Sequence, residues 1–134
     1  MAGATQEDGP EITLPASDDL STYQFHVVTL ATDGEVKLAD DPTDPVEALI
    51  GVLQNKPRAV GEEAVVRVSG IAKAVGGEAV NPGIWVTCDG NGHIIAAVVG
   101  EEVQSVVGIT IDAAVEDEIH EILVMPGSGY VAPA

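Results

Sequence analysis

From Phe25 onward, short apolar runs alternate with Asp-Gly, Asn-Gly and Gly-Gly steps, a pattern typical of strands joined by tight turns. Thr32-Asp33-Gly34 and Gly90-Asn91-Gly92 predict two hairpins, because Gly and Asn accept the positive φ that such turns require. Residues 65–68 and 119–125 predict longer strands with apolar side chains on both alternating faces. We therefore expect both strands to be covered in part on both sides.

The two halves of this pattern match when the chain is slid along itself. At an offset of 58 residues, Val28-Thr29 falls on Val86-Thr87 and Asp33-Gly34 falls on Asn91-Gly92. At an offset of 57, Ile50-Gly51-Val52 falls on Val107-Gly108-Ile109, and Val65-Val66 falls on Ile122-Leu123. This self-similarity predicts a duplicated β unit, with half-units at about residues 24–70 and 82–127.

The duplication also decides the reading of residues 44–53. Asp44-Pro45 resembles a helix start, and the apolar residues that follow have helical spacing. The counterpart segment, residues 106–111, is β-branched and predicts a strand. We therefore expect a strand over residues 49–53, with any helix confined to about residues 44–48. The glycines inside these strands are expected to mark bulges or bends.

These elements predict a mainly β fold, a compact, partly closed barrel or sandwich built from two copies of one unit around a pseudo-twofold. A chain of 134 residues suits one domain, which we place at residues 23–134. Residues 1–22 hold little apolar content and predict an extended N-terminal arm without a core of its own. Ile12, Thr13 and Leu14 are the only β-prone run in this arm and are our candidate partner-binding residues, by strand addition.

Charge excludes some partners without choosing one. The chain has 22 acidic and 5 basic residues, a formal net charge of −17, and such a field repels nucleic-acid phosphates and anionic membrane surfaces. The charge serves either solubility or attraction to a basic partner. Residues 1–10 lack the basic and apolar regions of a secretory signal, and no stretch has the apolar length of a membrane span.

No group of residues has the spacing that catalysis or metal binding requires. Cys88 is the one cysteine and is expected in the core, while His26, His93 and His120 are not spaced as zinc ligands. The serines lack a base and a strained turn, and the paired carboxylates fall between strands, where solvated turns are usual. We therefore assign no catalytic, metal-ligating or cofactor-binding residue, expect no cofactor, and do not expect an enzyme.

Several motifs in order resemble one known family. They are residues 60–73 (VGEEAVVRVSGIAK), residues 81–87 (NPGIWVT), the Asp89-Gly90-Asn91-Gly92 turn, residues 107–109 and residues 125–127. Their order and spacing resemble the small capsid decoration proteins of tailed bacteriophages, also called cement or head-stabilising proteins, over residues 25–127.

The resemblance implies a β-tulip-like domain that binds the outside of an assembled icosahedral head and reinforces it. It implies the major capsid protein as partner, self-association as a homotrimer, and a place on the outer surface of the virion after synthesis in the host cytoplasm. Residues 1–22 would be an arm that adds to the capsid lattice.

Two other classes remain open. A biotinyl or lipoyl carrier barrel also has two similar halves, and residues 70–83 are similar to its turns. It needs an acceptor lysine at a hairpin tip, whereas Lys73 lies in a strand-like run. A small hydrolase would use the paired carboxylates, for which the sequence offers no nucleophile or positioned base.

Overall fold

A computed structural model describes residues 9–40, 47–97 and 105–126. Across these ranges the chain forms ten strands and no helix, and so no helix that could cross a membrane. The first sheet contains β1 (Glu11–Pro15), β2 (Val27–Leu30), β3 (Val36–Leu38), β4 (Gly51–Leu53) and β5 (Glu63–Arg67). The second contains β6 (Gly70–Val75), β7 (Trp85–Cys88), β8 (Ile94–Ala96), β9 (Gly108–Thr110) and β10 (Ile119–Val124).

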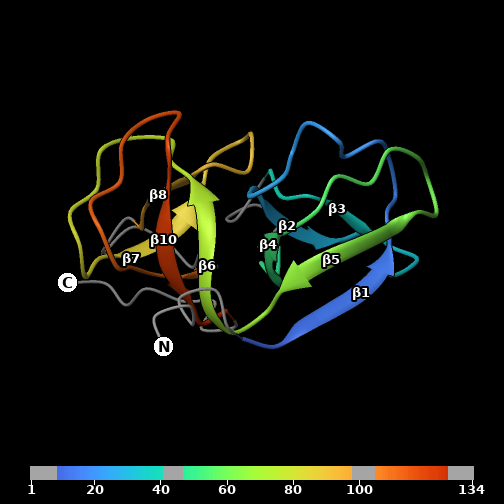
Figure 1. The fold of residues 1–134 in the computed structure, drawn as a ribbon, viewed down its shortest axis with the longest axis horizontal. Helices are drawn as coiled ribbons and strands as arrows, with labels where there is room; N and C mark the ends of the chain where they lie inside the picture. Colours follow the sequence, from blue (N-terminus) through green and yellow to red (C-terminus); the bar gives the residue numbers. More distant parts are fainter. Residues whose placement is uncertain (1–8, 41–46, 98–104, 127–134) are drawn as a thin grey trace.

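The second sheet repeats the topology of the first. The strand orders are β1-β5-β4-β2-β3 and β6-β10-β9-β7-β8, and all pairings between these strands are antiparallel. The sheets lie on opposite sides of the molecule, joined where β5 leads into β6 (Figure 1). The predicted all-β, duplicated body is confirmed, as a sandwich of two open sheets rather than a closed barrel.

Both predicted hairpins form. β2 and β3 are joined through Gly34 at φ 87°, and β7 and β8 through Gly92 at φ 75°. Matching backbone bonds close the two turns: the Ala31 N–H donates to the Glu35 carbonyl at 2.7 Å, and the Asp89 N–H donates to the His93 carbonyl at 2.9 Å. Glycine is required at both positions because left-handed backbone is costly for residues with a Cβ.

Gly51 and Gly108 are close-approach glycines at equivalent positions of β4 and β9. A Cβ on Gly51 would collide with the Arg67 carbonyl, and one on Gly108 with the Leu123 carbonyl. Arg67 and Leu123 are therefore counterparts, an offset of 56. The sequence alignment of the last strand, which set Val66 on Leu123, is wrong by one residue. A run of Ile, Leu and Val matches a valine-rich strand in either register, so side-chain similarity could not reveal the slip.

The duplicated unit also begins earlier than the sequence suggested, because β1 is the counterpart of β6. The Ser17 N–H donates to the Val36 carbonyl and the Gly77 N–H to the Ile94 carbonyl, each at 2.8 Å. The second unit thus starts at β6, not near residue 82.

The extended arm is also corrected for residues 9–22. β1 pairs with β5 of its own chain, and Ala16 and Leu20 are buried in the core at 0% and 2% exposure. Residues 1–8 lie outside the described residues. Local composition misled here because the few apolar side chains of this segment fill a core supplied mostly by the body.

The strand expected over residues 49–53 forms at Gly51–Leu53, and residues 47–50 are not helical. The remainder of the possible helix, residues 44–46, lies outside the described residues.

Each sheet has an inner and an outer face, which we define by counterpart residues. The inner face carries Val28 and Val66 in the first sheet and their counterparts Val86 and Ile122 in the second. The outer face carries Val27, Val52 and Arg67 in the first sheet and Trp85, Ile109 and Leu123 in the second.

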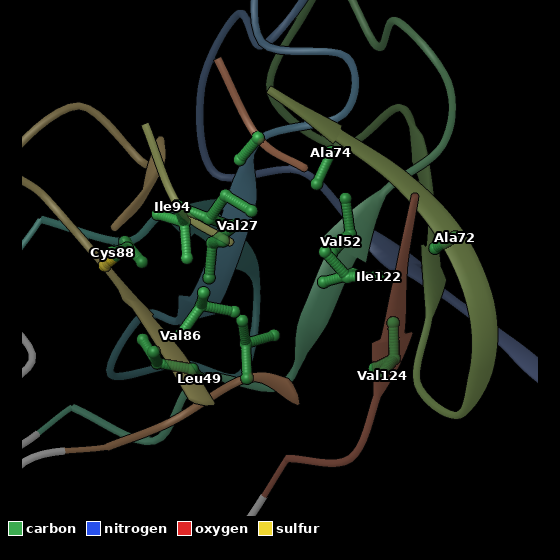
Figure 2. Close-up of a cluster of buried hydrophobic side chains, with 14 residues drawn as sticks. Val27, Leu49, Val52, Ala72, Ala74, Val86, Cys88, Ile94, Ile122 and Val124 are labelled. Atoms are coloured by element: carbon green, nitrogen blue, oxygen red, sulfur yellow. The ribbon is translucent and has the colours of Figure 1, made fainter. Parts of the chain in front are cut away.

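The halves pack through non-equivalent faces. Val27 and Val52, from the outer face of the first sheet, share one buried cluster with Val86 and Ile122, from the inner face of the second (Figure 2). A separate cluster fills the inner face of the first sheet. A twofold would bring equivalent faces together, so the expected pseudo-twofold is wrong. The halves are related head to tail.

Candidate functional site

Metal-ligating side chains of the described ranges do not assemble a metal centre. No three His, Cys, Asp or Glu side chains there are placed to hold a metal ion. Lys73, the acceptor that a carrier domain would need, lies in the middle of β6 opposite Glu121 rather than at a hairpin tip. Cys88 is buried in the core, as expected.

His26 and His93 lie together, although they are far apart in the sequence. Their ring centroids are 4.8 Å apart, and the Tyr23 ring meets that of His26 edge-on, with 5.3 Å between centroids. Asp89 lies near His93, with 3.7 Å between Oδ2 and Nδ1. Burial lowers the pKa of His26, and the nearby His93 adds to this effect. The arrangement packs the β7–β8 hairpin against the first half, since the Val27 N–H also donates to the Gly92 carbonyl at 2.8 Å.

His120 is a buried histidine on the inner face of β10. Neither ring nitrogen has a hydrogen-bond partner among the described residues, and burial lowers its pKa. The nearest carboxylate oxygen, on Asp112, is 3.9 Å from Nδ1 and partly offsets this effect. A neutral imidazole therefore fills the place that Ala64 takes in the first half.

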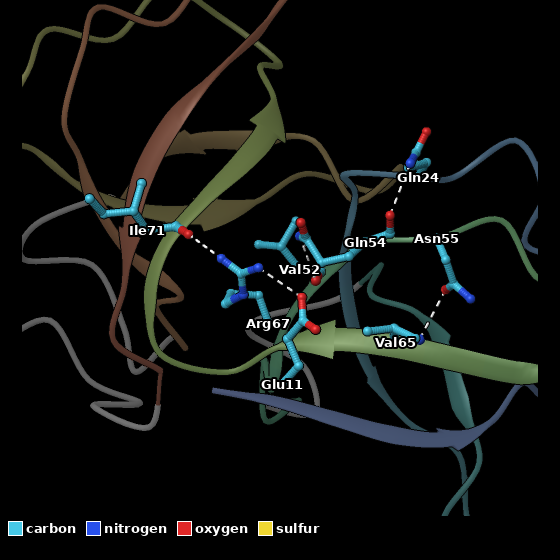
Figure 3. Close-up of polar contacts among 8 residues, drawn as sticks. All are labelled: Glu11, Gln24, Val52, Gln54, Asn55, Val65, Arg67 and Ile71. Atoms are coloured by element: carbon cyan, nitrogen blue, oxygen red, sulfur yellow. Dashed lines mark hydrogen bonds and ion pairs between the residues drawn. The ribbon is translucent and has the colours of Figure 1, made fainter. Parts of the chain in front are cut away.

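Arg67 links the halves (Figure 3). It donates to the Ile71 carbonyl at the start of β6 and forms an ion pair with Glu11 of β1 at 2.7 Å. The Arg67 side chain is 8% exposed and that of Glu11 is 37% exposed. Through these two contacts Arg67 holds β1 and the start of β6 to the end of β5.

A hollow of about 300 Å³ lies elsewhere on the first half. Its lining is Ser17, Asp18, Asp19, Leu20, Tyr23, Lys37 and Leu38. The Asp19 carboxylate accepts from the Ser21 N–H and hydroxyl at 3.0 and 2.6 Å, and these bonds lower the pKa of Asp19. The Asp19 carboxylate thus stabilises its own turn.

The outer face of the second sheet is the candidate interaction surface. Its cross-strand partners form one apolar row over four strands, Ile71, Leu123, Ile109 and Trp85. Trp85 is 40% exposed and Leu123 37% exposed. Lys73 and Glu121 face each other beside this row, and Ile119 lies beyond them at 55% exposure. Contiguous apolar surface of this kind marks interaction sites more often than isolated exposed residues do.

The predicted partner-binding residues lie on a different strand, β1. Ile12, Thr13 and Leu14 pair with Val66, Val65 and Ala64 of the same chain. β1 is the edge strand of its sheet, so only one of its two sides is occupied by β5. Their role toward a partner stays a prediction.

The fold is that of a known phage protein. The chain is similar in structure to the N base of the head fiber gp8.5 of bacteriophage phi29, with a TM-score of 0.58. The match covers 87% of this chain and 93% of that one, at 13% sequence identity. No family model matches the sequence. No curated protein is similar to it in sequence either. At this identity the likeness establishes a shared fold.

The apolar row was missed at the level of sequence because the strand at residues 119–125 is apolar on both faces. Such a strand does not reveal which face remains open. The duplication itself could have revealed the row, because it aligns Trp85 with Val27. A large aromatic residue in only one copy of the unit indicates a different environment at that position.

Proposed function

We propose that the chain is a non-enzymatic virion structural protein of a tailed bacteriophage. It binds the major capsid protein on the outer surface of the assembled head as a homotrimer and reinforces the head. The observation that carries this proposal is the fold shared with a phage head fiber base over 87% of this chain and 93% of the other. The order of motifs that resembles capsid decoration proteins points the same way.

The surface of the described chain suits binding better than chemistry. It offers an apolar sheet face on the second half, and no three of its His, Cys, Asp or Glu side chains are placed to hold a metal ion. A head presents many identical sites, so a trimer with modest affinity at each contact gains by multivalency. Ile12, Thr13 and Leu14 remain our candidates for the strand that a partner extends, because β1 is an edge strand.

The test is to mix the protein with heads of its own phage assembled without it, and to sediment them. We expect the protein to co-sediment and to saturate at a fixed number of copies per head. Heads carrying the protein should then release their DNA at a higher temperature than bare heads, in proportion to occupancy. Absence from the pellet at micromolar concentration, at both low and moderate salt, would overturn the proposal.

Heads of an unrelated phage serve as the control and should pellet without the protein. Intact mass measurement of the native protein separates the carrier alternative. A carrier carries an added cofactor mass on Lys73, whereas the proposed structural protein has the mass of its chain.

A further inference from the structure

Because the halves pack head to tail, a face that is covered in one half is exposed in the other. In the first half the outer face is covered, because Val27 and Val52 are buried against the second half. Nothing in the described chain covers the counterparts Trp85 and Ile109 in this way, and Trp85 is 40% exposed. Among the described residues, the outer face of the second sheet is therefore an uncovered copy of a buried interface.

The inner face of the first sheet is filled at its centre by its own buried cluster, but residues at its margin are exposed in the complementary way. In the second half, residues packed beneath the first half are buried, with exposures of 0–1%: Ala72, Cys88, Val107 and Val124. Their counterparts in the first half are Ile12, Leu30, Ile50 and Val68. Ile12 is 39% and Leu30 43% exposed, and the other two are partly buried at the edge of the inner cluster. Three of these four side chains are larger than their counterparts, and all four are less buried, since the described chain places no second unit against them.

We propose that the outer face of the second sheet of one molecule packs on the inner face of the first sheet of another copy of this chain. The contact repeats between molecules the one that joins the halves within a molecule. The row Ile71, Leu123, Ile109 and Trp85 covers Ile12, Leu30, Ile50 and Val68 of the neighbour. Two different faces meet, so the interface is heterologous and closes into a ring when its rotation permits.

This inference deepens the proposed function in one respect, since a trimer is one ring that the contact can close. The two contact surfaces are inferred from the packing of the halves within one chain, and they can be tested without phage heads. Each molecule has a charge of −17, which opposes association, but salt screens exposed charges beyond about 8 Å at physiological ionic strength. Association through these apolar faces is therefore expected to strengthen with salt.

The experiment uses native mass spectrometry and sedimentation equilibrium of the full chain with two blocking variants. L123D blocks the outer face and leaves the inner face intact, and L30D does the reverse. We expect wild type to form closed oligomers larger than dimers, and each variant alone to be monomeric. An equimolar mixture of the two variants, one of them isotopically labelled, should form 1:1 heterodimers and nothing larger, because only one pair of intact faces remains.

V60D is the matched control, since Val60 is 66% exposed and lies on neither face, and it adds the same charge. It should assemble like wild type. Circular dichroism and thermal melting of all variants establish that loss of assembly is not loss of fold. A wild-type protein that stays monomeric at about 100 μM in moderate salt, or an L30D protein that still assembles by itself, overturns the proposal. Failure of head binding with assembly intact would instead remove the capsid function alone.

Discussion

Val27 and Trp85 occupy the same position in the two halves, yet Val27 is fully buried and Trp85 is 40% exposed. Each pairs with the equivalent residue of the next strand, Val27 with Val52 and Trp85 with Ile109. The difference arises from packing. The second half lies on the outer face of the first half, whereas nothing in the described chain lies on the outer face of the second half. Duplication has thus produced one satisfied interface and one open copy of it.

Trp85 is the single tryptophan of the chain, so its fluorescence reports on this face directly. We expect its emission maximum to shift to shorter wavelength as concentration rises through the range in which oligomers appear, because the indole leaves water. L30D, which keeps Trp85 but blocks the opposite face, should show no shift. A constant emission maximum across the oligomerisation range would place Trp85 outside the interface.

Gly108 is expected to tolerate no side chain. A Cβ would collide with the backbone carbonyl of Leu123, and two paired strands would have to separate to admit it. Overpacking of this kind costs about 1–3 kcal/mol or more. We expect Gly108→Ala to lower the free energy of unfolding by that amount in denaturant titrations. Gly51→Ala should do the same, because its Cβ would meet the Arg67 carbonyl.

Gly90→Ala is the control for both changes. A Cβ on Gly90 meets no atom within 4 Å, so we expect a change within about 0.5 kcal/mol. Equal losses for Gly90→Ala and Gly108→Ala would mean that close approach does not set the requirement for glycine at position 108.

The duplication could be predicted from the sequence because turns carry their own signal. Asp33-Gly34 and Asn91-Gly92 need residues that accept positive φ, and few residue types do. The register of the last strand could not be predicted, because Val66 resembles both Ile122 and Leu123. β1 was missed for a similar reason: its counterpart β6 has Ala72 and Ala74 where β1 has Ile12 and Leu14. The size of the side chain at each of these positions depends on what packs against the strand, and not on the local sequence pattern.

The ion pair of Glu11 and Arg67 fills the positions of Ile71 and Leu123 in the other half. Glu11→Ile would leave a nearly buried guanidinium without its carboxylate. Removing one partner of a buried pair costs about 3–5 kcal/mol, and the partial exposure of Glu11 reduces this to about 1–3 kcal/mol. The double variant E11I/R67L installs the apolar pair of the second half and should recover most of the loss. Chemical denaturation of the two variants measures this, and a double variant no more stable than E11I would contradict it.

Stability should fall on mild acidification because two buried histidines resist protonation. Burial lowers the folded-state pKa of His26 and His120 below the ordinary value of 6.5. Below pH 6.5 the unfolded chain therefore binds more protons than the folded one, and unfolding becomes easier. The stability is fully present above pH 6.5 and is lost as pH falls toward the folded-state pKa values. Free energies of unfolding at pH 7.5, 6.5 and 5.5 should show this slope, and H120L should reduce it. An unchanged slope in H120L would assign the effect to other groups.

The open face could not be predicted from residues 119–125, because apolar side chains occur on both faces of this strand. His120, Ile122 and Val124 point inward, while Ile119 and Leu123 are exposed. Such a sequence indicates that both faces of the strand are covered, but not which face is covered by the same chain. The head-to-tail relation of the halves gives the answer, because the first half covers the inner face of the second sheet.

Removal of residues 1–22 should unfold the protein rather than release an arm. The deletion takes away β1, exposes the edge of β5, and removes Ala16 and Leu20 from the buried inner cluster. Loss of a buried leucine alone costs about 2–5 kcal/mol, a large part of the stability of a domain of this size. We expect the truncated protein to be insoluble or to melt far below wild type. A protein lacking residues 1–8 keeps every described strand and should melt like wild type. A soluble, cooperatively folded 23–134 fragment would return residues 9–22 to the status of a separate arm.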